Sequence, residues 1–380
     1  MSVHEQRQLA KKYPLLEWYE QYKTAGSVVL RAYELGKRMH FSRIIALAEC
    51  DILRAADLRK AFEIAGQQPP SAKAYRDKHE MKHYLHACGI PVAAGRRVES
   101  ALDIFDAAHA YGYPIVIKPI RSTGAQDIHI LRTEEALIGF VQQHYAQTFV
   151  YEPHLLVEQY IHGRSFHIDG LISGKTVVMI WPSEYLYDPL SVQTEGNPCC
   201  SMLLDKKHLL RHPLCDLVTR AITALPSPEH TTSFHAEAFV TDDHSVIFGE
   251  IACRTGGAYI NTLWSRAFDV NLDAYAARGQ AGLVDPIPSL ESRLDSLYGG
   301  MCIPPRFGKL RHIPRTCPLG YVHEYHPMGE PGRDYTHPTK TTECIASFLF
   351  SGSTTHQLKE RAREIRRWFH DHVRWSAIAS

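Results

Sequence analysis

Apolar residues along the first 72 positions follow patterns typical of alternating helices and strands. A stripe of apolar residues predicts a helix over 4–24, and a second stripe, closed by a glycine, predicts another over 54–65. Between these helices, the apolar runs at 27–30 and 44–48 have the length of short strands. We therefore expect residues 1–72 to form a small parallel α/β domain.

The pattern after this domain predicts a mixture of helices, strands and hairpins, and a Pro- and Gln-rich linker near residue 70 marks the boundary. The fold class is accordingly α/β (α+β). We expect helices over 74–88, 101–110, 134–145, 208–225 and 358–373, strands over 115–119, 127–131 and 155–159, and hairpins over 165–180 and 234–251.

Composition and charge exclude several classes of protein. Of the 380 residues, 44% are hydrophobic and 22% are charged, as in ordinary globular proteins, which excludes global disorder and a coiled coil. A net charge of +1 offers no large basic field to nucleic acid or a membrane surface, and no apolar run approaches the roughly 18 residues of a membrane span. The nine cysteines form no CxxC pair, and the N-terminus lacks the apolar core of a secretion signal. We expect a cytoplasmic protein with reduced thiols.

The string HEMKH at residues 79–83 matches the HExxH motif of zinc hydrolases. On a helix its two histidines share one face and could hold zinc, with the glutamate as general base. The longer zincin pattern is absent, because His86 stands where a glycine is needed and no third histidine follows in register. With 23 histidines in the chain, a chance match is the simpler interpretation.

A second set of residues, spread along the chain, fits a nucleoside triphosphate with its metal ion. Two ammonium groups would offset phosphate charge, a flexible loop would supply backbone N–H donors, and two carboxylates would hold Mg²⁺. An extended backbone could pair with the edge of adenine. In chain order the set comprises Lys78, Lys118, the small-residue loop 122–125, Glu158, Glu237, Glu250 and Arg254.

The two carboxylates Glu237 and Glu250 can be related through hairpin geometry. If the chain turns at 243–244, so that residue 242 faces residue 245, then Glu237 faces Glu250. Two like charges directly opposite one another destabilise a hairpin unless a cation lies between them. We expect a metal ion there; two solvated glutamates on an edge hairpin are the alternative.

The order and spacing of these motifs resemble the ATP-grasp superfamily, and within it carboxylate–amine ligases such as the L-amino acid ligases that make dipeptides. The resemblance implies a two-lobed ATP-grasp fold, with a linker helix and small nucleotide-binding lobe over 73–185 and a large C-terminal lobe with the metal site over 186–380. The segments that carry it are AYRDKHEMKHYLHACGIPV, GYPIVIKP, LVEQYIHGRSFHIDG and FHAEAFVTDDHSVIFGEIACRTGG.

The resemblance also implies a mechanism, in which ATP phosphorylates a small-molecule carboxylate and an amine then displaces phosphate to form an amide. The implied cofactors are ATP and Mg²⁺, with Mn²⁺ as an alternative metal. The implied contacts are Lys78, Lys118, Ser122, Thr123 and Gly124 to the phosphates, Glu158 and the backbones of Gln159 and Ile161 to adenine, Ser165 to ribose, Glu237 and Glu250 to the metal, and Arg254 to the transferring phosphoryl group and the oxyanion.

Two positions depart from the family pattern. The family often has Glu-x-Asn-x-Arg at the metal site, and this chain has Ala252 in the asparagine position. Ser165 stands where a ribose-binding glutamate is common, and Asp169 is a candidate to compensate. These departures leave open a non-catalytic nucleotide-binding protein, and related ATP-grasp chemistry such as carboxylation or thioester ligation to a carrier protein. A homodimer is a further expectation from the resemblance.

Overall fold

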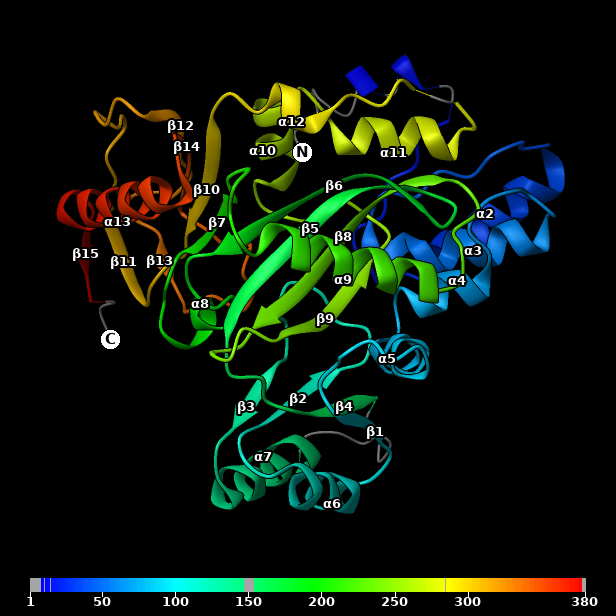
Figure 1. The fold of residues 1–380 in the computed structure, drawn as a ribbon, viewed down its shortest axis with the longest axis horizontal. Helices are drawn as coiled ribbons and strands as arrows, with labels where there is room; N and C mark the ends of the chain where they lie inside the picture. Colours follow the sequence, from blue (N-terminus) through cyan, green and yellow to red (C-terminus); the bar gives the residue numbers. More distant parts are fainter. Residues whose placement is uncertain (1–7, 10, 14, 147–153, 284, 378–380) are drawn as a thin grey trace.

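The computed structural model describes residues 8–9, 11–13, 15–146, 154–283 and 285–377. At its centre is an antiparallel sheet of eight strands in the order β12-β14-β10-β7-β6-β5-β8-β9 (Figure 1). These strands are β5 (Arg164–Ser173), β6 (Thr176–Tyr185), β7 (Cys199–Leu203), β8 (Thr231–Val240), β9 (Val246–Ala252), β10 (Leu297–Ile303), β12 (Val322–Pro327) and β14 (Ala346–Gly352).

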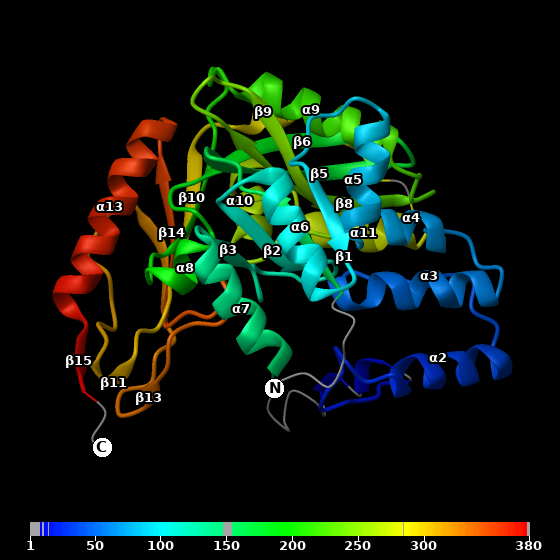
Figure 2. The ribbon, with the colours of Figure 1, turned by 90° about the horizontal axis from the view of Figure 1, so that it is seen from below.

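A separate small lobe lies below the large sheet in Figure 1 and consists of a four-stranded antiparallel sheet covered by two helices. Seen from below, these helices lie in front of the strands (Figure 2). Ile104, Ile115, Ile117 and Val157 are fully buried between the sheet and the helices. The elements are β1 (Gly95–Val98), α6 (Ala101–Tyr111), β2 (Ile115–Pro119), β3 (His129–Leu131), α7 (Glu134–Ala146) and β4 (Leu155–Gln159).

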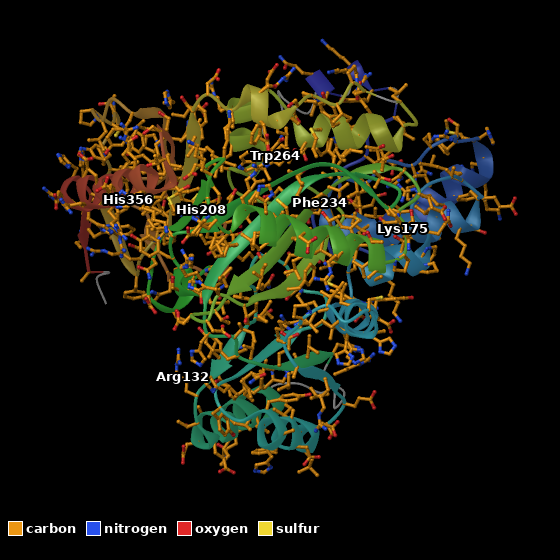
Figure 3. All side chains as sticks on the ribbon, in the orientation of Figure 1. Arg132, Lys175, His208, Phe234, Trp264 and His356 are labelled. Atoms are coloured by element: carbon orange, nitrogen blue, oxygen red, sulfur yellow. The ribbon has the colours of Figure 1, made fainter. Side chains whose placement is uncertain are left out.

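Two hydrophobic cores lie against the large sheet. One contains Phe234 of β8 and packs under α9, and the other contains Trp264 of α10 and continues to α13; both residues are labelled in Figure 3. The helices of this part are α5 (Lys78–Ala87), α8 (Ser191–Thr194), α9 (Arg211–Ala224), α10 (Ile260–Phe268), α11 (Leu272–Gln280), α12 (Leu290–Arg293) and α13 (Thr355–His372). A third sheet joins β11 (Gly308–His312), β13 (Asp334–Tyr335) and β15 (Arg374–Ser376).

The mixed α+β character predicted from the sequence is confirmed, as are the hairpins and most of the helices expected after residue 74. The boundary expected at residue 185 does not separate the two sheets. The β5–β6 hairpin pairs with β8 and β7 inside the large sheet, so the small sheet ends with β4 at Gln159. Within the described residues, no helix is both long and apolar enough to cross a membrane.

The N-terminal part differs from the expected parallel α/β domain. Its described residues up to the linker contain helices α2 (Ser27–Arg38), α3 (Ile52–Ala61) and α4 (Pro69–Ala74) and the short 3₁₀ helix η1 (Glu49–Asp51), with no strand among them. The run 27–30 is the first turn of α2, because the residues that follow it are good helix formers and extend it. The helix expected over 4–24 is not continuous, since residues 15–24 are not helical; residues 4–7 lie outside the described part.

The run 44–48 belongs to no helix or strand. The side-chain amide of Gln280, at the end of α11, takes the place of a neighbouring strand: Ala46 N–H donates to Gln280 Oε1 at 2.9 Å, and Gln280 Nε2 donates to the Ala46 carbonyl at 3.0 Å. A side chain that satisfies one residue's backbone groups removes the need for a β ladder. This segment leads directly into Glu49, which lines the candidate site.

Candidate functional site

A cavity of about 480 Å³ lies between the small lobe and the large sheet. Ten of the twelve residues singled out from the sequence line it, and the other two, Lys78 and Ser122, lie in a small adjoining pocket that shares Glu250 and Arg254. The fold therefore gathers residues from 78 to 254 around one hollow. The ten are Lys118, Thr123, Gly124, Glu158, Gln159, Ile161, Ser165, Glu237, Glu250 and Arg254.

Two lysines share one buried carboxylate on the small-lobe side of the cavity. Lys118 at the end of β2 lies 2.7 Å from Glu158 of the neighbouring strand β4, and Lys82 of α5 forms an ion pair with the other carboxylate oxygen. Burial opposes ionisation of Glu158, but the two ammonium groups outweigh it and lower its pKa. Burial likewise opposes the charge on Lys118, yet Glu158 raises the Lys118 pKa overall. The three groups carry a net positive charge that faces the cavity.

This arrangement changes the role expected for Glu158. Its carboxylate is occupied by the lysines, so it balances their charge and is not free for the edge of adenine. The Gln159 N–H is also used, because it donates to the Ala94 carbonyl at 2.8 Å. Ile161, beyond the end of β4, lines the cavity together with the apolar side chains Val116 and Phe248. Lys82 was not singled out from the sequence, because it was seen only as a variable position of the HExxH string.

Lys78 connects the loop after β2 to the β8–β9 hairpin. It opens α5 directly after the helix cap Asp77, and it is almost fully buried. Its ammonium group lies 3.3 Å from Glu250 and donates to the Ser122 carbonyl at 2.9 Å. Among the described residues the HExxH histidines of the same helix join no metal-binding group, and Glu80 pairs with Lys73 instead, so the zinc interpretation finds no support.

Glu237 and Glu250 lie directly opposite each other on β8 and β9, as the hairpin argument predicts. The register expected nearer the turn is wrong, because Val240 pairs with Val246, and a bulge at Gly249 restores the Glu237–Glu250 pair. A Cβ atom at Gly249 would come within 2.9 Å of the Glu237 carbonyl, so the bulge requires glycine. Both glutamate side chains are about one-third exposed (33% and 34%) and face the cavity.

This pair of carboxylates fits a divalent cation. Burial would raise the pKa of Glu250, but Lys78 and Lys118 lower it to about 2, so the group is an anion at neutral pH. Carboxylate oxygens are the ligands that Mg²⁺ and Mn²⁺ prefer. The residues present on the hairpin can therefore hold the metal ion that accompanies a nucleoside triphosphate.

A chain of buried polar groups leads from this hairpin into the sheet. Asp169 of β5 lies between two imidazoles, with His167 Nδ1 at 2.5 Å and His235 Nδ1 at 2.8 Å from its two oxygens. His167 Nε2 lies 2.5 Å from the Ser201 hydroxyl, and His235 Nε2 lies 3.5 Å from Glu237. Asp169 is fully buried and committed to the histidines, so it cannot serve the ribose role considered for it.

The charges in this chain follow from burial and pairing. Burial opposes the negative charge on Asp169, but the two histidines lower its pKa to about 2. Burial also opposes protonation of His235, yet the Asp169 carboxylate raises the His235 pKa to about 9. From the sequence, Asp169 was considered only for a ribose role, and His167 and His235 were seen only as parts of strands. Their signal was polar residues at alternate positions of strands that are otherwise apolar.

Arg254, after β9, is held by a residue of the N-terminal part. Its Nε pairs with Glu49, whose other oxygen accepts from Arg76 at 2.5 Å, and its Nη1 donates to the Thr255 carbonyl. Burial would raise the pKa of Glu49, but the two guanidinium groups lower it overall. Glu49 was missed from the sequence, although it directly follows the apolar run 44–48.

The loop 122–126 closes one side of the cavity. Gly124 has a positive φ of +64°, and its carbonyl accepts from the backbone N–H and the hydroxyl of Thr341, both at 3.3 Å. Gln193 of α8 donates to the Ala125 carbonyl at 2.8 Å. The loop thus links the small lobe to two segments of the large lobe across the cavity mouth, while Ser165 lines the wall beneath.

Comparison with known proteins finds sequences similar to parts of this chain. Residues 77–169 match the family model of the carbamoyl-phosphate synthase L chain, ATP-binding domain. Over 258 residues the chain is 27% identical to an L-arginine-specific L-amino acid ligase of Bacillus subtilis; the match covers 65% of this chain and only 58% of that ligase.

Solved structures share the fold. A crystal structure of an L-amino acid ligase from Bacillus licheniformis superposes with a TM-score of 0.71 at 18% identity, covering 95% of this chain and 86% of that one. The N5-carboxyaminoimidazole ribonucleotide synthetase of Thermotoga maritima superposes with a TM-score of 0.64 at 15% identity, covering 92% and 86%. These likenesses show that the chain has the ATP-grasp fold, and that residues 77–169 are similar to the ATP-binding domain of that superfamily.

Proposed function

We propose that this protein is an ATP-dependent ligase that joins a carboxylate to an amine through an acyl phosphate. The observation that carries the proposal is the single cavity whose wall combines Lys118, Glu237, Glu250 and Arg254, with Lys78 adjoining it. Phosphoryl transfer to an acid requires cations that bind phosphate, carboxylates that hold a metal ion, and a fixed guanidinium.

The residues of the chain take distinct parts in this chemistry. Lys78 and Lys118 bind phosphate oxygens, and Glu237 and Glu250 hold a divalent cation, which neutralises phosphate charge when bound. One oxygen of the substrate carboxylate attacks the γ-phosphorus, and ADP leaves. The amine then attacks the carbonyl carbon, loses a proton, and displaces inorganic phosphate.

Arg254 and the loop 122–126 act on the intermediates. The guanidinium of Arg254 is fixed by Glu49 and lines the cavity, which supports a role in stabilising the transferring phosphoryl group and the oxyanion of the tetrahedral intermediate. The loop, tied to Thr341, screens the acyl phosphate from water, which would otherwise hydrolyse it. The apolar wall with Val116, Ile161 and Phe248 suits the adenine ring.

An amino acid is the carboxylate that we favour, because the Bacillus subtilis and Bacillus licheniformis relatives are named L-amino acid ligases. The second candidate is carboxylation, in which bicarbonate is the acid. It is favoured by the likeness to the Thermotoga maritima synthetase, whose name denotes a carboxyaminoimidazole product.

The experiment that tests the proposal follows oxygen as well as ADP. The protein is incubated with MgATP and pairs of amino acids, one of them ¹⁸O-labelled in its carboxylate, and ADP, phosphate and condensed products are analysed by mass spectrometry. We expect one ¹⁸O atom in the released phosphate and an amide product. ADP release that needs bicarbonate would favour carboxylation, and ATP binding without ADP release under any substrate pair would contradict an enzymatic role.

A further inference from the structure

Three neighbouring strands present their side chains in two rows on the face that lines the cavity. His167, Glu237 and Glu250 are partners across β5, β8 and β9 in one row. Asp169, His235 and Ala252 are partners in the adjacent row. His235 therefore lies two residues from Glu237 on the same face of β8, and directly opposite it stands an alanine, which offers no ligand atom.

The ring of His235 is held in one orientation. Asp169 is a fully buried carboxylate, and an ionised carboxylate can only accept hydrogen bonds, so the 2.8 Å contact places a proton on His235 Nδ1. The other oxygen of Asp169 is held by His167, which prevents the carboxylate from turning away. Nε2 of His235 consequently points toward Glu237, at 3.5 Å from Oε1, and the ring lines the cavity while only 9% exposed.

An imidazole whose Nδ1–H is held by a carboxylate and whose Nε2 faces another carboxylate is the arrangement that proteins use for metal ligation. We propose that His235 is a third protein ligand of the divalent cation, through Nε2, beside Glu237 and Glu250, and that Asp169 orients it. The inference rests on the proposed function for the presence of the cation.

A mixed set of two carboxylates and one imidazole has a consequence for metal choice. Mg²⁺ strongly prefers oxygen, whereas affinity for nitrogen increases from Mn²⁺ onward along the first-row metals. The site should therefore bind Mn²⁺ more tightly than Mg²⁺, by a margin larger than an all-oxygen site gives.

A metal ion inside the group His167, Asp169 and His235 is the competing possibility, since their ligand atoms lie within 4.8 Å of one another. The short contacts of Asp169 to both Nδ1 atoms occupy the atoms that such an ion would need. His167 Nε2 is likewise engaged by Ser201. The geometry favours the site at Glu237 over this one, and the two differ in a measurable way.

Pulsed EPR of Mn²⁺ bound to the full chain with ADP tests the inference directly. Two samples are compared, one of natural abundance and one in which histidine carries ¹⁵N, so that nitrogen from adenine is distinguished from nitrogen of the protein. We expect a hyperfine coupling from one directly bound histidine nitrogen, which changes from ¹⁴N to ¹⁵N with the label. Bound Mn²⁺–ADP without a histidine coupling would overturn the inference and leave the proposed function intact.

Substitutions show which histidine supplies the nitrogen that is bound to Mn²⁺. His235→Asn should abolish the coupling, and the matched variant His167→Asn should retain it; the reverse result would place the ion among the buried histidines and overturn the inference. Asp169→Asn should weaken Mn²⁺ binding about 10- to 100-fold, because an amide N–H would turn the imidazole into the tautomer with its proton on Nε2. If Mn²⁺–ADP does not bind to the wild-type protein at all, the proposed function fails, and this inference fails with it.

Discussion

The ammonium group of Lys118 lies 2.7 Å from the carboxylate of Glu158, whose other oxygen pairs with Lys82. Replacing Glu158 by Gln would leave two buried ammonium groups without an anion between them. We expect the free energy of unfolding to fall by about 3–5 kcal/mol, the usual cost of breaking a buried ion pair. MgATP should restore more of the lost stability in this variant than it adds to the wild type, because its phosphates supply the missing anion.

Denaturant unfolding with and without MgATP measures both effects. Glu184→Gln is the matched control, since Glu184 is equally buried and pairs with Lys359 at 2.8 Å but does not line the cavity. The control should lose stability without a larger response to nucleotide. If MgATP increases the free energy of unfolding equally in the two variants, Glu158 does not belong to the nucleotide site.

Glu250→Gln should abolish turnover while the fold survives. The substitution removes one of the two facing carboxylates and with it half of the negative charge that holds the cation, and a bound metal ion is worth several kcal/mol of transition-state stabilisation. ADP release should fall below about one hundredth of the wild-type rate. The side chain is 34% exposed, so circular dichroism should be unchanged. Glu360→Gln on the exposed face of α13 serves as control, and an unaltered rate in Glu250→Gln would contradict the metal assignment.

Glu49→Gln should weaken the interaction that joins the N-terminal part to Arg254. An amide cannot hold Arg76 and Arg254 together as a carboxylate does, so the guanidinium of Arg254 loses its fixed position. We expect kcat to decrease about tenfold, the cost of one misplaced charge-assisted hydrogen bond, with the KM for ATP nearly unchanged. Steady-state kinetics separate the two constants. An increase in kcat would mean that Glu49 restrains Arg254 in the free protein.

His230 predicts a pH dependence of stability away from the cavity. Burial, together with the charge of Arg59, lowers its pKa from 6.5 to about 3, so the folded protein keeps this imidazole neutral. The unfolded chain takes up a proton near pH 6.5, and the folded chain does so only near pH 3. The stability that His230 contributes is therefore present above pH 6.5 and is lost as the pH falls toward 3.

Denaturant unfolding of the wild type and of His230→Gln across pH 7 to 4 isolates this effect, because the carboxyl groups that also titrate are common to both. The wild type should lose stability faster than the variant as the pH falls. Parallel curves would show that folding does not lower the pKa of His230.

Local patterns were sufficient for several parts of the structure. The Asp77 cap and the glycine after residue 88 bracket α5. The polar turn predicted the β8–β9 hairpin, but Glu237 lies opposite Glu250 only because the bulge at Gly249 offsets a register near the turn that differs from the expected one. These features depend on interactions between residues close in sequence, which a single sequence displays.

The two strands predicted in the N-terminal part do not form, because residues distant in the sequence decide whether a strand has a partner. The run 44–48 has the composition of a strand, but a strand exists only when another strand pairs with it, and here Gln280, more than 230 residues away, satisfies Ala46. Strand formation depends on tertiary partners more than helix formation does. The chain therefore has a helical N-terminal part in its described residues, where a sheet was expected.

Residue types and their order along the chain were sufficient to indicate the chemistry that we propose, because phosphate binding, metal binding and acyl transfer each demand particular charges that few side chains supply. The tertiary structure decided which of these charges lie next to each other. Glu158 lies between two lysines, Glu49 pairs with Arg254, and Asp169 pairs with His235, and each of these contacts joins segments that are distant in the sequence. Burial strengthens such contacts and sets their pKa values, and burial exists only once the lobes and the sheet have assembled.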